Sequence, residues 1–545
     1  MLFSTCLLQG QNEASNWFFG ENCGLYFDGD SVLTNTSSEI SPNEGVSTIS
    51  DCKGNLLFYS DGQSVWDRRH SLMANGQGLD GHYSATQGSI IIPHPGNCDL
   101  FFIFTLDAKE NNYREGLKYS VVDRSLQNGY GEVTLKNVPL YAPAAEKLTA
   151  VKHSNGVDVW VISHEMYSNS FRSYLVTSAG LNPDPVISSA GTVFNQTHDG
   201  MGQMKVSANG SKLAFVTLVT KFVEIFDFDN SSGLVSNPIH IPSDHFTALG
   251  GLYGLEFSPD AGKLYVSNPH LHYLDQPGNL YQVDLLAGSP LDIINSTTIV
   301  GHNLPSTDIR GLQLAPDGKI YVSRAFGRNL GVINNPDAAG LASDYLDSGL
   351  DLNNKVALWT LPNFITSFLD IHNSSILGAE FQFENTCVGE PVQFREESTG
   401  DATSFLWDFG DGNFSTDQHP NHTYFSTGSY DVSLVVSKEC CQDTFTKRIQ
   451  ITDCTFYLYA PNAFSPNGDG INDVYYLKGA GIEALTFEVF NRWGQMIYKS
   501  NDIHQGWDGQ YKNRKLDPGV YLYKIMLRYT NGEQSLKTGS ITLLR

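Results

Sequence analysis

Apolar and polar positions repeat one unit through residues 45–324: an apolar strand, a turn containing Gly or Asn, and a second, more aromatic strand. Because Asp, Asn and Gly supply the positive φ of a tight turn, each unit predicts a β-hairpin. The copies start 43 to 60 residues apart. They are GVSTISDCKGNLLFYS (from Gly45), GSIIIPHPGNCDLFFIFT (from Gly88), LTAVKHSNGVDVWVIS (from Leu148), GQMKVSANGSKLAFVT (from Gly202), GLEFSPDAGKLYVSN (from Gly254) and GLQLAPDGKIYVSR (from Gly311).

A repeat of about 50 residues built from short strands is the period of a β-propeller blade. The pattern therefore predicts an all-β fold that begins with a six- or seven-bladed β-propeller over residues 15–375. A seventh blade would be closed jointly by the strand around Trp17 to Phe27 and the segment Lys355 to Phe368. The alternative is an array of unrelated hairpins in β-sandwiches, which would not repeat one unit at regular intervals.

Residues 379–453 do not continue the repeat and have a different sequence pattern. An aromatic run, WDFGDG (from Trp407), is followed by HPNHTY (from His419) and GSYDVSLVV (from Gly428). Tyr430, Val432 and Leu434 alternate with period two, as in a half-buried strand. These motifs, in this order, resemble the PKD family. The resemblance implies an immunoglobulin-like β-sandwich that acts as a spacer or binding module in extracellular proteins. Asp408 and Asp411 would bind calcium or fix the turn by accepting backbone N–H groups.

Residues 455–545 contain PNAFSPNGDGIND (from Pro461), FNRWG (from Phe490), GWDG (from Gly506) and PGVYLY (from Pro518). These motifs resemble the gliding-motility-associated carboxy-terminal domain of Bacteroidetes, the type B sorting domain of the type IX secretion system. The resemblance implies a second small β-sandwich that directs a protein across the outer membrane to the cell surface or the medium. The type IX secretion machinery is then an expected partner.

Charge narrows the choice of partners. The chain has 34 Lys and Arg against 58 Asp and Glu, a net charge of −24, which argues against a nucleic-acid-binding surface. Residues 455–545 carry ten basic and eight acidic side chains, so the acidity belongs to the preceding regions. No apolar run of 18 residues is present, which argues against a transmembrane segment.

The amino terminus and the cysteines indicate an oxidising compartment. Residues 1–14 begin with the apolar stretch LFSTCLL but lack a basic residue, so they are interpreted as a signal-peptide remnant or as an ordinary disordered end. Cys387 and the pair Cys440 and Cys441 lie at opposite ends of the PKD-like region. A disulfide between them would close a loop of about 50 residues. Connectivity is not deducible from sequence, and free thiols are the alternative.

One cluster has the residue types of a calcium loop, in which oxygen ligands alternate along a glycine-bent turn. The candidate ligands are Asn467, Asp469, Asn472 and Asp473. The glutamate that completes an EF-hand loop is missing, so a hydrogen-bonded Asx-turn is the alternative. No other cofactor is indicated.

No catalytic motif appears in a fitting context: there is no GxSxG, P-loop or Rossmann fingerprint, and His164-Glu165 lacks the second His of a zinc helix. The leading hypothesis is a secreted or cell-surface binding or adhesion protein whose propeller recognises a glycan or protein ligand. The alternative is a surface hydrolase that acts on polysaccharide or peptide through paired carboxylates of the propeller.

Overall fold

A computed structural model describes residues 12–29, 31–246, 250–269, 278–302, 308–371, 377–400, 402–438 and 441–545. The chain divides into two compact units. Unit 1 comprises residues 1–379 with residues 398–404 and 436–443, and unit 2 comprises the remainder. The signal-peptide remnant predicted at residues 1–14 lies outside the described residues, apart from the short 3-10 helix η1 (Asn12–Ala14). Among the described residues, no helix is long and apolar enough to cross a membrane.

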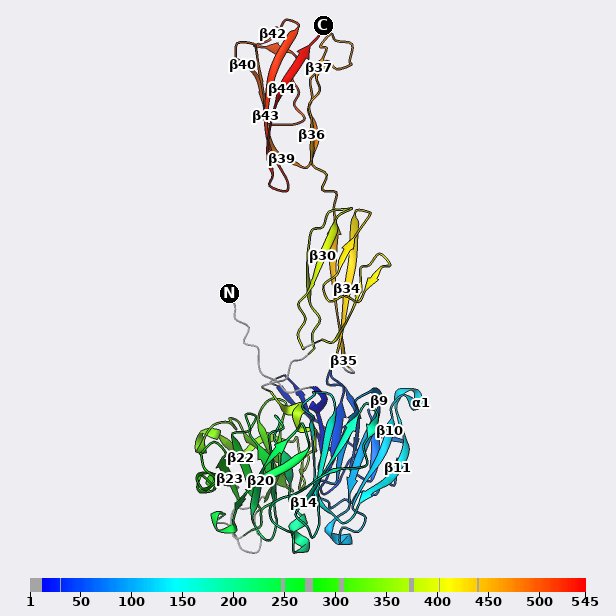
Figure 1. The fold of residues 1–545 in the computed structure, drawn as a ribbon, viewed down its shortest axis with the longest axis vertical. Coiled ribbons are helices and arrows are strands. Elements are labelled where there is room, and N and C mark those ends of the chain that lie inside the picture. Colours follow the sequence, from blue (N-terminus) through cyan, green and yellow to red (C-terminus); the bar gives the residue numbers. More distant parts are fainter. Residues whose placement is uncertain are drawn as a thin grey trace. The chain divides into compact units, whose positions relative to one another are not determined.

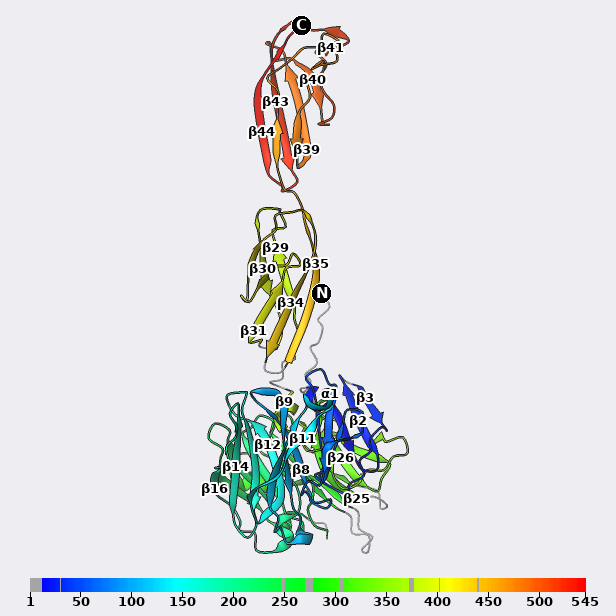
Figure 2. The same cartoon turned by 90° about the vertical axis from the view of Figure 1, so that its right-hand side faces the viewer.

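Unit 1 contains a β-propeller, as the repeats predicted (Figures 1 and 2). Six antiparallel units of four or five strands follow one another along the chain, and the first two are joined by one parallel pair. Their strands are β4 (Ser47–Ser50), β5 (Leu56–Ser60), β6 (Ser64–Asp67) and β7 (Leu72–Gln77); β8 (Ser89–His94), β9 (Asn97–Leu106), β10 (Leu117–Asp123) and β11 (Glu132–Tyr141); β12 (Ala144–Lys152), β13 (Val159–Glu165), β14 (Ser170–Thr177), β15 (Gly180–Leu181) and β16 (Val186–Ser189); β17 (Met204–Val206), β18 (Lys212–Val216), β19 (Val223–Asp229) and β20 (Leu234–Ile241); β21 (Leu255–Phe257), β22 (Lys263–Asn268), β23 (Asn279–Asp284) and β24 (Thr298–His302); β25 (Asp308–Leu314), β26 (Ile320–Ala325), β27 (Asn329–Ile333) and β28 (Tyr345–Asp351).

A seventh sheet is formed by β1 (Asn16–Phe19), β2 (Cys23–Asp28) and β3 (Ser31–Asn35). The segment that follows β28 pairs with it through an antiparallel bridge between Glu21 and Val356. Trp17 is fully buried, and its ring lies 5.9 Å from that of Phe364. Segments from both ends of the propeller sequence therefore contact each other and close the ring.

The six sequence repeats are the first two strands of the six regular blades. The first strands are buried, and in five of the six blades the turn after the first strand carries a left-handed residue such as Gly54, Gly210, Ala261 or Gly318; the turn at Pro95-Gly96 is the exception. Short helices lie in the connections: α1 (Leu126–Gly129), α2 (Pro290–Asn295), η2 (Lys109–Asn111), η3 (Thr197–Gly200), η4 (Ser243–His245), η6 (Gly340–Ser343) and η7 (Thr366–Leu369).

The PKD-like region forms two facing sheets around Trp407, which is fully buried against Phe381 and Phe394. Asp411 accepts a hydrogen bond from the Asn413 backbone N–H, as expected of a turn residue. The strands are β29 (Phe381–Glu384), β30 (Pro391–Glu396), β31 (Ser404–Asp408), β32 (Phe414–Ser415), β33 (Asn421–Thr423), β34 (Gly428–Lys438) and β35 (Cys441–Ile451).

The carboxy-terminal region has its own core, centred on Trp507, whose ring lies 5.3 Å from Phe464 and 5.2 Å from Tyr521. Its main sheet has the order β37-β44-β43-β39-β40. The strands are β36 (Tyr457–Tyr459), β37 (Ala463–Phe464), β38 (Lys478–Ala480), β39 (Ile482–Phe490), β40 (Met496–Ser500), β41 (Gln510–Tyr511), β42 (Arg514–Lys515), β43 (Gly519–Tyr529) and β44 (Gln534–Leu543).

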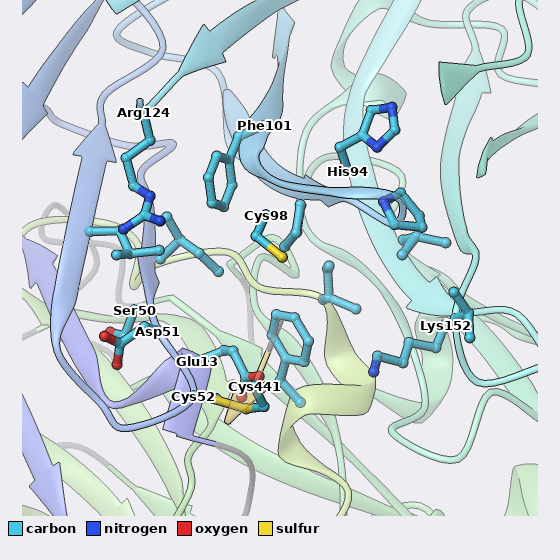
Figure 3. A pocket seen from close by; sticks show the side chains of 18 of the residues that line it. Glu13, Ser50, Asp51, Cys52, His94, Cys98, Phe101, Arg124, Lys152 and Cys441 are labelled. Atoms are coloured by element: carbon cyan, nitrogen blue, oxygen red, sulfur yellow. A yellow bond between two sulfur atoms is a disulfide. The ribbon is translucent and has the colours of Figure 1, made fainter. Parts of the chain in front are cut away.

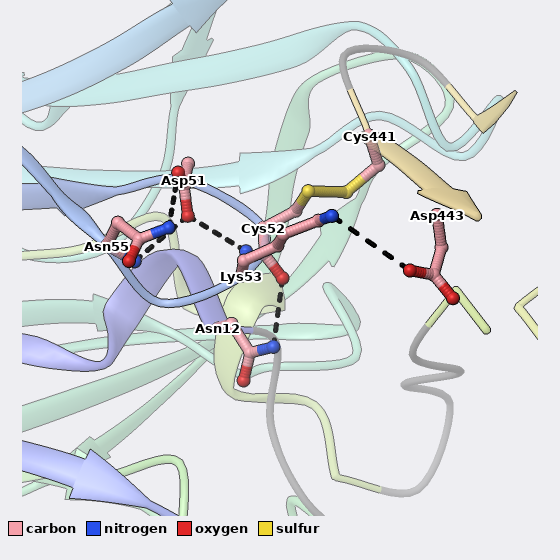
Figure 4. The surroundings of a disulfide bond; sticks show 7 residues. All are labelled: Asn12, Asp51, Cys52, Lys53, Asn55, Cys441 and Asp443. Atoms are coloured by element: carbon pink, nitrogen blue, oxygen red, sulfur yellow. Dashed lines mark hydrogen bonds and ion pairs between the residues drawn. A yellow bond between two sulfur atoms is a disulfide. The ribbon is translucent and has the colours of Figure 1, made fainter. Parts of the chain in front are cut away.

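The expected disulfide between Cys387 and Cys440 or Cys441 is wrong. Cys387 pairs with Cys454, and Cys441 pairs with Cys52 in the turn between β4 and β5 (Figure 4). Cys387 lies opposite Thr452, just after β35, whereas Cys441 begins this strand of 11 residues. At about 3.3 Å per residue, the two positions are too far apart for the Cα separation of a disulfide, which is below about 7 Å.

Candidate functional site

The first strands of consecutive blades contact one another at the centre of the propeller. Each starts at the same end, because every blade repeats the same up-and-down order. The side chains at these starts, together with Trp359 of the segment that follows β28, form a group that we name the inner ring. Its members are Glu44, Thr86, Glu146, Gln203, Tyr253, Arg310 and Trp359.

Hydrogen bonds connect the inner ring from blade to blade. The Gln203 backbone N–H donates to the Tyr253 carbonyl, and the Gln203 Oε1 atom accepts from the N–H groups of Leu255 and Leu312. The Gly311 N–H donates to the Trp359 carbonyl. The positions of the ring side chains are thus fixed by the strands that carry them.

Glu146 is the most fully hydrogen-bonded acid of the ring. Its Oε2 accepts from the backbone N–H and the hydroxyl of Thr86, at 2.9 and 2.8 Å, and its Oε1 accepts from the Lys109 N–H at 2.9 Å. Burial raises the pKa of Glu146 to about 7, although these donors oppose the rise. Both oxygens are engaged, so this carboxyl holds the loops at residues 86 and 109 in place.

Lys147, the next residue, is fully buried on the other face of β12. Its Nζ donates to the carbonyls of Met201, Gly202 and Val216, at 3.1, 2.9 and 2.8 Å. Burial lowers the pKa of Lys147 to about 7. Since each proton of the ammonium group has an acceptor, Lys147 links two blades and serves the architecture.

One part of the ring contains polar atoms that lack a well-formed hydrogen bond. It consists of Glu44, Tyr253, Arg310 and Trp359. The Arg310 guanidinium lies 4.0 Å from the ring centroid of Trp359 and 5.2 Å from that of Tyr253. Asp308 holds it with an ion pair of 2.6 Å. Trp359 is only half-buried, so this pair reaches the surface of the ring.

Glu44 and Tyr253 lie beneath that pair, both buried. Burial raises the pKa of Glu44 well above its ordinary value; the Glu146 carboxylate adds to the rise, and the nearby Tyr253 hydroxyl opposes it. Glu44 Oε2 and the Tyr253 hydroxyl are near enough to interact with each other, but neither atom reaches hydrogen-bond geometry with a partner in the described part of the chain. Buried polar atoms without partners are uncommon in folded proteins, so these two atoms suit a ligand or an ordered water.

Deeper in the propeller, the charged groups are paired. The Lys205 ammonium lies 3.2 Å from Glu256 Oε2 and also donates to Gln313. Glu256 Oε2 accepts the Leu314 N–H in addition. This network is saturated and buried, and it joins three blades.

A cavity of about 140 Å³ lies at the opposite ends of the first strands, among the turns that follow β4, β8 and β12 (Figure 3). Its walls include Ile49, Phe101 and Phe368, and Arg124 and Lys152 stand on different sides of it. The Cys52–Cys441 disulfide and Cys98, which is also disulfide-bonded, line it. An apolar space of this size accommodates a molecule about as large as benzene, not a glycan chain.

The predicted calcium residues form a hydrogen-bonded loop on the surface of unit 2. Asp473 accepts the N–H groups of Gly468 and Gly470, at 2.6 and 2.8 Å. Asp469 accepts the Ile471 N–H and the Asn467 amide, and Asn472 adopts a left-handed φ of 55°. All four carboxylate oxygens thus have donors, and calcium binding at Asn467, Asp469, Asn472 and Asp473 stays a prediction. Among the residues that the structure describes, no group of three His, Cys, Asp or Glu is arranged to hold a metal ion.

The sequence did not identify the inner ring, although a signal for it is present. Three of its members, Glu44, Tyr253 and Arg310, immediately precede a repeat, and Thr86 and Glu146 lie one position further upstream of theirs. His164, by contrast, is fully buried in β13, stacks on Phe194 at 4.2 Å, and has its pKa lowered to about 3 by burial. It belongs to the core, as expected from its strand context.

Two regions of the sequence match known domain families. Residues 379–452 match the PKD domain, and residues 458–543 match the CHU_C type IX secretion signal domain. The chain is similar to collagenase ColQ1 of Bacillus cereus (strain Q1), with 27% identity over 184 residues that cover 28% of this chain and 19% of the collagenase. It is also similar to a microbial collagenase of Vibrio alginolyticus, with 48% identity over 54 residues, which cover 9% of this chain and 7% of that protein. The chain thus spans less than a fifth of the length of either relative.

Similar solved structures include the PKD1 domain of the Vibrio cholerae metalloprotease PrtV, at 30% identity and a TM-score of 0.13, covering 14% of this chain and 95% of that one. A putative 6-phosphogluconolactonase from Bacteroides uniformis covers 63% of this chain and 97% of its own, at 14% identity and a TM-score of 0.40. The chain therefore carries a PKD domain and, after it, a type IX secretion signal domain, which directs the protein to the cell surface or the medium.

Proposed function

We propose that the protein is an exported binding protein whose propeller, over residues 15–375, holds a saccharide at the inner ring. In this proposal the PKD domain, over residues 379–453, is a spacer, and residues 455–545 are the sorting signal. The observation that carries the proposal is the pair of buried polar atoms, Glu44 Oε2 and the Tyr253 hydroxyl, which lack a well-formed hydrogen bond and lie near the Arg310 guanidinium.

The chemistry of these groups and of Trp359 favours a ligand rich in hydroxyls. Burial raises the pKa of the Glu44 carboxyl, which accepts hydrogen bonds in either protonation state and also donates one when protonated, and the Tyr253 phenol both donates and accepts. The half-buried Trp359 offers an apolar ring face, and the guanidinium donates to hydroxyl oxygens. Few, well-placed polar groups beside an aromatic wall are typical of small-molecule and sugar sites.

A hydrolase is the second candidate, because Glu44 and Glu146 lie near enough to influence each other. Two carboxyls with different pKa values are the usual acid and base of glycoside hydrolysis. However, Glu146 accepts three hydrogen bonds from Thr86 and Lys109, and this leaves neither oxygen available to attack a substrate or a water. This arrangement favours binding over catalysis.

The test is a glycan array probed with the full-length protein and with two variants. Glu44→Met keeps roughly the length of the side chain and removes both its hydrogen-bond donor and its acceptors, so we expect the signals of bound glycans to fall about tenfold. The matched control is Glu115→Met, on the surface of the same propeller, which should leave the signals unchanged. An array without any bound glycan, or equal signals for Glu44→Met and the native protein, would contradict the proposal.

A further inference from the structure

The main sheet of the carboxy-terminal domain carries apolar side chains on its outer face. Strand β43 alternates: Tyr521, Ile525 and Leu527 enter the core, whereas Val520 and Leu522 face outward. In register, Leu522 lies opposite Phe490 of β39, and Phe490 lies opposite Met496 of β40. An apolar row therefore crosses three strands.

The turn between β39 and β40 extends this row with Trp493. We name the five residues Phe490, Trp493, Met496, Val520 and Leu522 the outer patch. Trp493 is 85% exposed, Val520 59% and Leu522 52%. Contiguous exposed apolar side chains, with an aromatic residue at the margin, are typical of protein-interaction surfaces rather than of an ordinary solvent face.

Basic side chains accompany the outer patch. Arg492 adjoins Trp493 in sequence and lies near the Tyr521 hydroxyl. Burial raises the pKa of Tyr521, the Asp517 carboxylate adds to the rise, and the charge of Arg492 opposes it. Lys524 is the next outward residue of β43 after Leu522. Neither Arg492 nor Lys524 forms an ion pair within the described residues, unlike Lys499 and Arg528 of the same sheet.

The charge of the whole chain sharpens this contrast. Residues 455–545 carry ten basic and eight acidic side chains, in a protein of net charge −24. A partner that binds this domain but not the acidic remainder of the protein needs a surface complementary to the outer patch. Such a surface has an apolar centre and carboxylates at its rim, which attract the basic side chains here and repel the acidic surface elsewhere.

We propose that the outer patch is the surface by which the domain docks on a protein of the type IX secretion machinery, and that the receiving surface is apolar with an acidic rim. The inference rests on the sorting role of this domain and assigns a surface to it. Docking would bury the exposed Trp493 and Leu522 side chains and pair Arg492 and Lys524 with carboxylates, so export should depend on these side chains rather than on the fold alone.

The test expresses the full chain in a bacterium with a type IX secretion system and measures how much protein is outside the cell and how much is in the periplasm. The double variant W493S/L522K and the single variant V520K change outward-facing side chains only. Both should lower the exported fraction about tenfold, and the missing protein should accumulate in the periplasm. The matched control is Y457S/Y459S, which changes two exposed side chains of β36 in the same domain, 50% and 57% exposed, and should be exported normally.

Two further measurements separate the outcomes. Urea unfolding of the purified variants, with midpoints equal to that of the native protein, shows that the domain is folded. Deletion of residues 455–545 should abolish export; normal export of that deletion would contradict the sorting role itself. If the protein that lacks residues 455–545 stays in the periplasm but both patch variants are exported normally, the sorting role of the domain stands and the docking role of the outer patch is refuted. A change in oligomeric state with normal export would likewise refute docking on the machinery and assign the patch to self-association.

Discussion

Replacing Lys147 by Met tests whether the interface between the third and fourth regular blades is sealed from water. The structure buries the Lys147 ammonium completely and gives it three carbonyl acceptors. Because burial lowers its pKa from 10.5 to about 7, the folded protein binds fewer protons than the unfolded chain between those pH values. The contribution of Lys147 to the free energy of unfolding is therefore greatest above pH 10.5, and it is lost as the pH falls from 10.5 through 7.

The magnitude follows from the size of the pKa change. With 1.36 kcal/mol per pKa unit, raising the pH from 7 to 9.5 should add about 3 kcal/mol to the free energy of unfolding through Lys147. K147M cannot bind the proton in either state, so this gain disappears. The variant will also be less stable at both pH values, since three carbonyls lose their donor at a cost of about 1 to 3 kcal/mol each.

The assay is urea unfolding of the native protein and K147M at pH 7 and pH 9.5, with disulfides intact. At each pH the free energy of unfolding of K147M is subtracted from that of the native protein, and the two differences are compared. Titration of the many tyrosines affects both proteins equally and cancels in this comparison. K212M is the control, because Lys212 forms an ion pair with Asp227 on the surface. If the native protein and K147M show the same pH dependence of stability, water reaches Lys147 and the sealed interface between these two blades is refuted.

Two further predictions concern the small domains. The double variant C387S/C454S, which opens a disulfide spanning 67 residues, should lower the stability of the PKD domain by about 4 kcal/mol in urea unfolding; an unchanged midpoint would show that the bond does not constrain the unfolded chain. Millimolar calcium should leave the thermal midpoint of the carboxy-terminal domain unchanged, since the carboxylate oxygens of Asp469 and Asp473 already accept hydrogen bonds; a calcium-dependent rise in the native protein that D473N lacks would instead establish the calcium site.

The repeats predicted the propeller because the hairpin is a local structure. The alternation of apolar residues and the positive φ of Gly54 or Gly318 lie within one short stretch of sequence, so the first two strands of every regular blade were placed correctly. The closure of the ring by the segments around Trp17 and Phe364 was predicted on a different ground, because propeller rings are commonly sealed by segments from both ends of the chain.

The inner ring escaped prediction for the opposite reason. Glu44, Tyr253 and Arg310 are more than 50 residues apart, and each is a single polar residue before an ordinary apolar strand. Only the common direction of the first strands brings them together. The disulfide prediction was wrong for a related reason. Cys387 and Cys441 lie near the two ends of the PKD sequence region, but Cys387 lies beside the end of β35 and Cys441 lies at its beginning, so the length of the strand separates them.

The most direct test of the account measures the affinity of the full-length protein for its best array saccharide by titration calorimetry. Three proteins are compared: the native one, R310M and R172M. Arg172 is the matched control, because its guanidinium also lies over an aromatic ring, Tyr141 at 4.6 Å, but outside the inner ring. The account predicts that R310M weakens binding about tenfold or more and that R172M binds as the native protein does. Equal dissociation constants for R310M and the native protein would contradict the assignment of the inner ring as the binding site.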